Sequence, residues 1–236
     1  MSASFTLHFD HADFLVIEKA AGVNFHDEED IGSGLFSQVK ARFSDESLFP
    51  VHRLDKMTSG LLIIAKSLEC AQYFQQLFET RRIDKYYLAL SDLKPKKKQG
   101  LIVGDMAKSR RGSWKLLRTK ENPAITQFFS YSIASKLRLF CLKPHTGKTH
   151  QIRVALASIA SPIIGDDYYH AKQPSNNEST SPDRGYLHAF CVKFTYKQQD
   201  FSFLAPPTTG HLFLTDGCQQ QLQHIGDPSS LPWPTV

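Results

Sequence analysis

Short apolar segments recur along this chain, and several of them are separated by too few residues to hold a helix. Eight of these segments are predicted as strands: residues 14–19, 48–51, 61–65, 85–90, 125–132, 137–144, 187–196 and 201–206. Parallel neighbours need a crossover connection of a dozen or more residues, and several of the links are shorter than that. The pattern therefore predicts an α+β fold with a mixed, largely antiparallel sheet and a few flanking helices.

Apolar residues follow a helical period in three places. The segment 35–43 repeats an apolar residue at every fourth position, which predicts a short amphipathic helix. Ser67 is typical of an N-cap, and the apolar residues from 70 to 78 share one face of the helix that would follow it. The segment 152–159 has the same character. These three helices are too few to cover both faces of a doubly wound sheet.

Length and composition indicate one self-contained domain over residues 1–236. The chain has 41% hydrophobic and 22% charged residues, which is ordinary for a globular protein that buries a sizeable core. The segments 172–184 and 226–236 are rich in turn-forming residues, so we expect both to be mobile.

Several functional classes are excluded by what the chain lacks. Its longest apolar run, Leu61 to Ala65, is too short to cross a bilayer, and its N-terminus has no signal-peptide pattern. The four cysteines form no CxxC pair, so neither a zinc site nor a disulfide framework is expected. We expect a soluble cytoplasmic monomer with no metal, no cofactor and no obligate protein partner.

Positive charge is concentrated in one stretch, the basic segment from Lys94 to Lys120. It contains ten lysines and arginines and one acid, whereas the rest of the chain has more acids than bases. A short apolar stretch, Leu101 to Val103, divides the segment in the pattern of two basic loops that flank a strand. The segment also contains Trp114, whose ring could stack on a base. A solvated surface loop is the alternative, but this asymmetry favours contact with nucleic acid. Seven of the bases are candidates for the phosphate backbone: Lys96, Lys97, Lys98, Lys108, Arg110, Arg111 and Lys115.

The loop at residues 52–60, HRLDKMTSG, places a carboxylate among basic and hydroxyl side chains between two predicted strands. Loops held by a rigid sheet commonly carry catalytic groups. An ordinary turn, in which Asp55 and Thr58 bond to nearby amides, is an equally valid interpretation of these residues alone.

The sequence of this loop, extended to Leu61, resembles the signature of the RluA family of pseudouridine synthases, HRLD followed two residues later by TSGL. Five further segments are similar to the family's other motifs in the same order: Val16–His26, Lys85–Tyr87, Thr146–Arg153, Ile164–Asp166 and Leu187–Ala189. Ala20 stands where the family usually has proline. The resemblance covers about residues 14–206, and the small RNA-binding module that precedes the catalytic domain in some members is expected to be missing.

The resemblance implies a catalytic domain with a central active-site cleft that converts uridine to pseudouridine in structured RNA. Asp55 would be the essential carboxylate, either attacking the ribose or removing a sugar proton, and both routes stay open. A lone buried carboxylate tends to become protonated, and the family assigns the compensating cation to Arg153. Tyr87 would pack against the flipped uracil, while Tyr86 would point to the opposite face.

The matched motifs supply the remaining candidates for substrate contact: His52, Arg53, Leu54, Thr58, Gly60, Thr149, His150 and Gln151. Arg53 would either fill the space vacated by the extruded base or contact phosphate. The RNA would be a stem-loop of ribosomal or transfer RNA, and the sequence does not choose between them.

Other motifs are rejected. Gly147-Lys148-Thr149 is not a phosphate-binding loop, because residue 142 is Leu where that motif needs Gly. His145 and His150 have no clustered third ligand for a metal, and Asp166-Asp167 is interpreted as a turn. Two rival functions are a catalytically silent RNA-binding protein and a nucleoside hydrolase, which would release free uracil.

Overall fold

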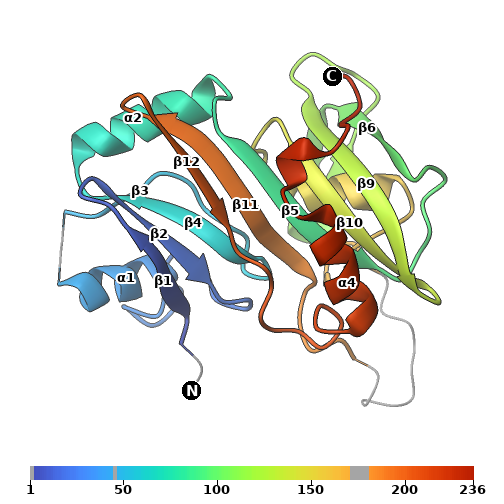
Figure 1. The fold of residues 1–236 in the computed structure, drawn as a ribbon, viewed down its shortest axis with the longest axis horizontal. Helices are drawn as coiled ribbons and strands as arrows, with labels where there is room; N and C mark the ends of the chain where they lie inside the picture. The colour runs from blue at the N-terminus through green and yellow to red at the C-terminus, as the bar shows by residue number, and fades with distance from the viewer. Residues whose placement is uncertain (1–2, 45–46, 171–180) are drawn as a thin grey trace. The chain divides into compact units, whose positions relative to one another are not determined.

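The computed structural model describes residues 3–44, 47–170 and 181–236 (Figure 1). Contacts divide the chain into two compact units. Unit 1 comprises Met1–Asp84 and Ala189–Ala205, and unit 2 comprises Lys85–His188 and Pro206–Val236. The prediction of one catalytic domain over the whole chain stays a prediction.

Unit 1 is a sheet packed against an aromatic core. Its strands are β1 (Phe5–Asp10), β2 (Phe14–Lys19), β3 (Phe49–Pro50), β4 (Ser59–Ala65), most of β11 (Leu187–Tyr196) and β12 (Gln199–Leu204). The order is β1-β2-β4-β11, with β3 paired to β4 and β12 to β11. Every residue of β4 is buried, which explains its continuous apolar run.

Two helices complete unit 1, α1 (Leu35–Phe43) and α2 (Leu68–Glu79). The Ser67 side chain caps α2 by accepting a hydrogen bond from the Cys70 amide at 3.1 Å. Phe74 of α2 lies in the core and packs edge-on against Phe14 of β2, with ring centroids 5.5 Å apart. The Ser67 cap and the buried helix face thus agree with the sequence.

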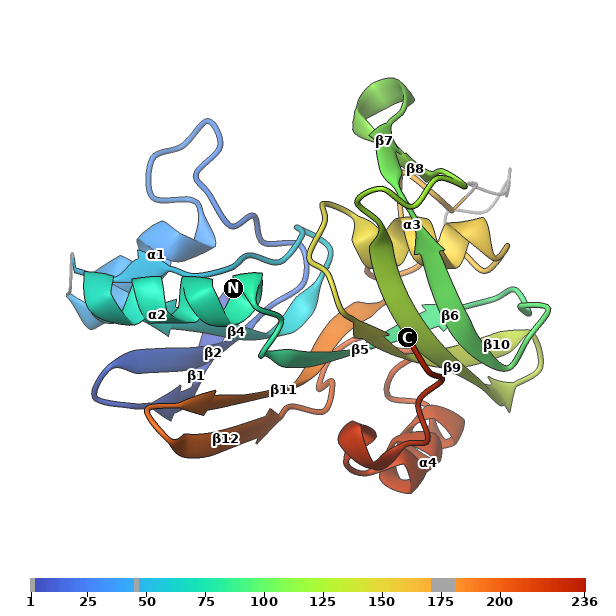
Figure 2. The same cartoon turned by 90° about the horizontal axis from the view of Figure 1, so that it is seen from above.

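Unit 2 contains an antiparallel sheet in the order β5-β10-β9-β6. These strands are β5 (Asp84–Ser91), β6 (Gln99–Gly104), β9 (Ala124–Ala134) and β10 (Leu137–Pro144). Helix α3 (Gln151–Ser158) covers one face of this sheet and α4 (Asp216–Ile225) the other (Figure 2). A separate hairpin pairs β7 (Met106–Lys108) with β8 (Trp114–Leu116), and the turn between them contains the 3-10 helix η1 (Arg110–Gly112).

The predicted α+β class with a largely antiparallel sheet is confirmed, and each predicted strand and helix has a counterpart. The sequence did not predict β1, α4 or the short strands β7 and β8. Strand β1 buries no residue fully, and α4 contains three consecutive glutamines, so neither segment has a strong apolar pattern.

The C-terminal segment 226–236, whose expected mobility stays a prediction, makes packing contacts in the structure. The Trp233 indole donates to the Pro228 carbonyl at 2.8 Å and packs against Phe129 and Tyr86, with ring centroids 5.0 and 5.8 Å away. The turn-forming composition of this segment does not reveal these contacts, which one large aromatic ring provides. In the other segment expected to be mobile, 172–184, residues 172–180 lie outside the described residues.

Candidate active site

Asp55 lies in a loop whose backbone is fixed on both sides of the carboxylate. The Asp55 loop, residues 52–60, is closed by a hydrogen bond from the Thr58 amide to the Asp55 carbonyl at 3.0 Å. The Lys19 ammonium, only 2% exposed, donates to the Lys56 carbonyl at 3.2 Å and to two carbonyls of the turn that follows β2. Asp55 itself is a partly exposed residue.

His52 supports the first half of this loop. Its Nε2 accepts a hydrogen bond from the Ile63 amide of β4 at 2.9 Å, and its ring packs on Phe78 of α2 with centroids 4.9 Å apart. Because Nε2 is the acceptor, the neutral ring carries its proton on Nδ1. The ring therefore joins the loop to a strand and a helix of unit 1.

The other candidates in the loop divide by exposure. Leu54 and Thr58 are 6% and 2% exposed, whereas Arg53 is exposed. Gly60 has φ +103°, and a Cβ there would come 2.8 Å from the Ala189 backbone nitrogen. Leu54, Thr58 and Gly60 thus shape the loop, and Arg53 is directly accessible to a ligand.

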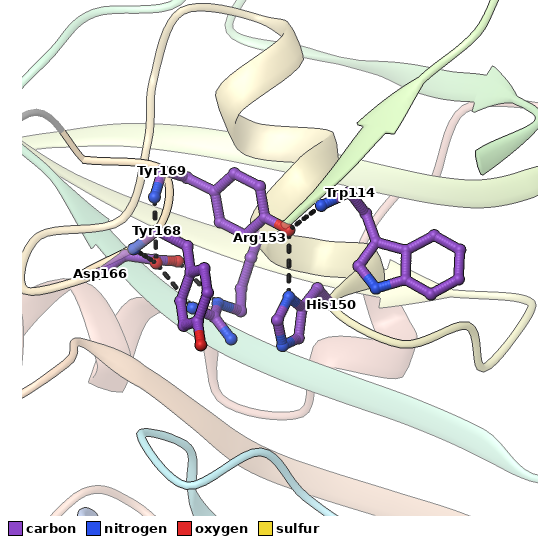
Figure 3. Close-up of polar contacts among 6 residues, drawn as sticks. All are labelled: Trp114, His150, Arg153, Asp166, Tyr168 and Tyr169. Carbon is purple, nitrogen blue, oxygen red and sulfur yellow. Dashed lines mark hydrogen bonds and ion pairs between the residues drawn. The ribbon is translucent and has the colours of Figure 1, made fainter. Parts of the chain in front are cut away.

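In unit 2 the buried Arg153 of α3 forms a two-pronged ion pair with Asp166 (Figure 3). Its Nε and one Nη donate to the two carboxylate oxygens, each at 2.7 Å. The side chains of Arg153 and Asp166 are 5% and 0% exposed. A guanidinium carries five N–H donors, and the two bonds to Asp166 use two of them. The arginine is thereby held in one orientation by a fixed counterion.

Two tyrosines flank the guanidinium. The Arg153 Cζ lies 5.2 Å from the ring centroids of both Tyr168 and Tyr169, within the range of cation–π attraction. The same Asp166 carboxylate accepts hydrogen bonds from the Tyr168 and Tyr169 amides at 2.9 and 3.2 Å. Asp166 is in a turn, as predicted, and it is also the partner of Arg153, which the sequence reasoning missed.

His150 forms the N-cap of α3 with a left-handed backbone, φ 58°. Its Nδ1 lies 3.0 Å from the Tyr169 hydroxyl. Thr149, the residue before it, is exposed. A left-handed non-glycine residue at a helix start is uncommon and is typical of a functional turn.

Gln151 organises the TGKTH turn from within. Its Oε1 accepts from the Thr146 hydroxyl at 2.6 Å and the Lys148 amide at 3.0 Å. Its Nε2 donates to the Ile125 carbonyl at 3.1 Å and the Thr126 hydroxyl at 3.0 Å. With 5% exposure and these four bonds, Gln151 holds the turn, and its predicted substrate contact stays a prediction.

The two neighbouring tyrosines of strand β5 differ in exposure. Tyr86 is 1% exposed and belongs to the core, while Tyr87 is partly exposed and lies opposite Leu142 of β10. Two residues earlier, burial lowers the pKa of the Lys85 ammonium below its ordinary value. Tyr87 is therefore the member of the pair that a ligand can contact.

The basic segment is split into two groups by β6. The basic loop, residues 94–98, precedes this strand, and the basic hairpin, β7–β8 with its turn, follows it. All seven predicted backbone-contact bases are exposed: Lys96, Lys97, Lys98, Lys108, Arg110, Arg111 and Lys115. The strand expected between two basic loops is confirmed as β6, whereas the second basic group is a hairpin rather than a loop.

The predicted residues group by unit. His52 to Gly60 lie together in unit 1, and Tyr87 and Thr149 to Arg153 in unit 2. The sequence reasoning missed Lys19, Asp166 and Tyr169 as site residues. The motifs that contain Lys19 and Asp166 had been matched to the family, and that match was the available signal.

The described ranges, 3–44, 47–170 and 181–236, contain no cluster of three or more histidine, cysteine or acidic side chains that could hold a metal. Within the same ranges, no helix has the length and apolar character needed to cross a bilayer.

Comparison with known proteins gives a consistent result. Residues 13–158 match the family model described as RNA pseudouridylate synthase. An uncharacterized RNA pseudouridine synthase of Haemophilus influenzae is 47% identical over 91% of this chain and 93% of its own length. Ribosomal large subunit pseudouridine synthase D of Borreliella burgdorferi is 30% identical over 68% of this chain, which spans 53% of that protein. The solved structure of human RNA Pseudouridylate Synthase Domain Containing 1 aligns over 98% of this chain and 97% of its own, with TM-score 0.71 and 25% identity.

Proposed function

Because the chain belongs to the RNA pseudouridylate synthase family, and so isomerises uridine to pseudouridine in RNA, we propose that Asp55 is the carboxylate that acts on the ribose. The observation that carries this proposal is the contrast within the Asp55 loop. Lys19 and His52 hold the surrounding backbone in place, while Asp55 remains partly exposed. A reactive group needs this combination of fixed position and access.

The isomerisation breaks the bond between N1 of uracil and C1′ of ribose and forms a bond between C5 and C1′. The hydrogen on C5 is lost and N1 gains one, so the product has the composition of the substrate and no redox partner is needed. Asp55 either attacks the sugar or removes a sugar proton. In both routes the carboxylate must be ionised before it reacts, because only the anion can attack the sugar or accept its proton.

Arg153 is proposed as the cation that favours this ionised state. Its burial and its two bonds to Asp166 support the role, because the guanidinium is preorganised and costs no reordering during the reaction. Replacement by lysine would keep the charge but lose the planar fork that pairs with Asp166. We therefore expect Arg153→Lys to lower the maximal rate by an order of magnitude or more.

Tyr87 is proposed to pack its ring against the extruded uracil. Its partial exposure on β5, beside the fully buried Tyr86, supports this role. Extruding a stacked base costs about a few kcal/mol, and an aromatic face recovers part of that cost. The exposed Arg53 is proposed either to fill the gap left in the RNA or to contact phosphate.

The proposed substrate is a stem-loop of ribosomal or transfer RNA. The Borreliella relative is named for the ribosomal large subunit, whereas the name of the Haemophilus relative specifies no RNA. Mapping pseudouridines by chemical labelling in total RNA, from cells with and without the gene, would identify the modified site.

The proposal is tested by comparing wild type with Asp55→Asn, which removes the charge and preserves the side-chain size. RNA transcribed in vitro is incubated with each protein, and pseudouridine, free uracil and RNA affinity are measured. We expect pseudouridine without free uracil from wild type, and no pseudouridine but near-normal affinity from the variant. Free uracil would indicate a hydrolase, and normal pseudouridine yield from the variant would rule out Asp55 as the catalytic carboxylate.

A further inference from the structure

The basic hairpin is too short to hold its own position. It pairs three residues with three, Met106–Lys108 with Trp114–Leu116, and a lone two-stranded hairpin is at best marginally stable in water. At its base the Leu117 amide donates to the Asp105 carbonyl at 2.7 Å. Towards its basic end, Arg111 has a left-handed backbone, φ 53°, inside η1. The orientation of its exposed arginines therefore depends on contacts beyond the base of the hairpin.

One such contact comes from Tyr169. Its hydroxyl accepts a hydrogen bond from the Trp114 backbone amide at 2.8 Å, at the point where β8 begins (Figure 3). Since the oxygen is already an acceptor, its own hydrogen is available to His150 Nδ1, 3.0 Å away. Trp114 lies opposite Lys108 in the hairpin register, so this bond holds the strand pair next to the basic turn.

The other end of Tyr169 is fixed to the ion pair. Its ring lies over the Arg153 guanidinium, and its amide donates to Asp166. A hydrogen bond from the His170 amide to the Asp166 carbonyl at 3.1 Å closes the turn, residues 166–170. One side chain thus joins the basic hairpin to the arginine of the candidate active site, and all of these residues belong to unit 2.

The same turn also bonds to the end of the strand that leads into the basic loop. His170 Nε2 lies 3.0 Å from the Asp92 carboxylate, two residues before Lys94. The turn therefore contacts the basic hairpin directly and holds a residue close to the start of the basic loop.

We propose that Tyr169 is a positioning residue: its hydroxyl docks the basic hairpin against the Arg153–Asp166 pair, so that phosphates bound by Arg110 and Arg111 hold the RNA in a fixed relation to Arg153. The proposal rests on the proposed function, because it takes RNA as the ligand. It goes further in assigning a specific coupling role to one hydroxyl group.

The chain offers a matched pair of variants. Tyr168 and Tyr169 are neighbours, their rings lie at the same 5.2 Å from Arg153, and both amides bond to Asp166. Among the residues with described positions, the Tyr168 hydroxyl has no hydrogen-bond partner, whereas that of Tyr169 bonds to the hairpin. Tyr169→Phe and Tyr168→Phe therefore delete the same atom and differ in the hairpin bond.

The first measurement is hydrogen exchange of the Trp114 amide in the free protein. Losing one neutral hydrogen bond changes an equilibrium by about two- to tenfold. We expect Tyr169→Phe to speed exchange at Trp114 by that factor and Tyr168→Phe to leave it at the wild-type rate. Equal rates in both variants would overturn the docking role of Tyr169.

The second measurement is affinity for a fluorescently labelled RNA stem-loop with a uridine in its loop, over a range of salt concentrations. We expect Tyr169→Phe to weaken binding about two- to fivefold and to raise KM more than it lowers kcat. Replacing Arg110 and Arg111 by Gln should then cost less affinity in the Tyr169→Phe background than in wild type. Equal costs in the two backgrounds would overturn the coupling.

These outcomes are separable from those for Asp55. If Asp55→Asn abolishes pseudouridine formation but Tyr169→Phe changes neither amide exchange nor RNA affinity, the proposed function stands and the role of Tyr169 is refuted. If the stem-loop binds wild type with no dependence on salt, RNA contact by the arginines is refuted whatever the tyrosine variants do.

Discussion

Replacing Asp166 by Ala should destabilise unit 2 strongly, because it removes the counterion of a buried guanidinium. The Arg153 side chain is 5% exposed and that of Asp166 is inaccessible, and both carboxylate oxygens are used. Breaking one partner of such a pair typically costs about 3–5 kcal/mol, since the remaining charge stays desolvated. The amides of Tyr168 and Tyr169 also lose their acceptor, but they lie in a turn where water can replace it.

Both tryptophans of the chain, Trp114 and Trp233, lie in unit 2, so their fluorescence during urea denaturation reports on that unit. With a denaturant slope of about 2 kcal/mol per molar, a loss of 3–5 kcal/mol moves the midpoint down by about 2 M. Asp167→Ala is the matched control, because the neighbouring carboxylate is exposed, and its effect should stay within about 0.5 kcal/mol. Equal midpoints for the two variants would refute the account of the ion pair.

Three further predictions concern other parts of the chain. Gly60→Ala should destabilise unit 1 by about 3 kcal/mol, because φ +103° and the Ala189 backbone leave no room for a Cβ; a thermal midpoint equal to wild type would contradict this. Reversing the charge of four exposed bases, two in the basic loop (Lys96, Lys97) and two in the hairpin (Arg110, Arg111), should weaken RNA affinity and flatten its salt dependence; an unchanged salt slope would show that these bases do not contact phosphate. All four cysteines are buried thiols, and burial raises the pKa of Cys218 to about 12, so iodoacetamide at pH 8 should modify them only after unfolding; rapid labelling of the native protein, measured by mass spectrometry, would contradict the burial.

Local sequence signals predicted the parts of the fold that depend on neighbouring residues. The continuous apolar run at 61–65 became β4, where burial on both faces removes the usual alternation. Ser67 became the N-cap of α2 because its hydroxyl satisfies an otherwise unpaired amide of the first turn. Strand β1 was missed because it buries no residue fully, and α4 because its run of glutamines hides a narrow apolar face.

Candidate site residues could be named where they belong to a short sequence motif. Their partners from distant parts of the chain could not. Asp55 was selected because its loop resembles the family signature, but the Lys19 ammonium that bonds to this loop comes from a strand 37 residues earlier. Arg153 was selected from its motif, whereas its pairing with Asp166 needs a contact across a loop that no periodicity reports. The strand that divides the basic segment was predictable from its apolar residues, whereas the β7–β8 pairing was missed because strands of three residues are too short to show an alternating pattern.

The role of Asp55 is tested most directly by a single-turnover experiment with protein in excess over RNA that carries tritium at C5 of uridine. Forming the new carbon–carbon bond must release that tritium to water, so the rate reports on chemistry after binding is complete. We expect wild type to release the label and Asp55→Asn to release it about a thousandfold more slowly or not at all. Release by Asp55→Asn at the wild-type rate, with RNA bound to saturation, would contradict the central claim that this carboxylate carries the reaction.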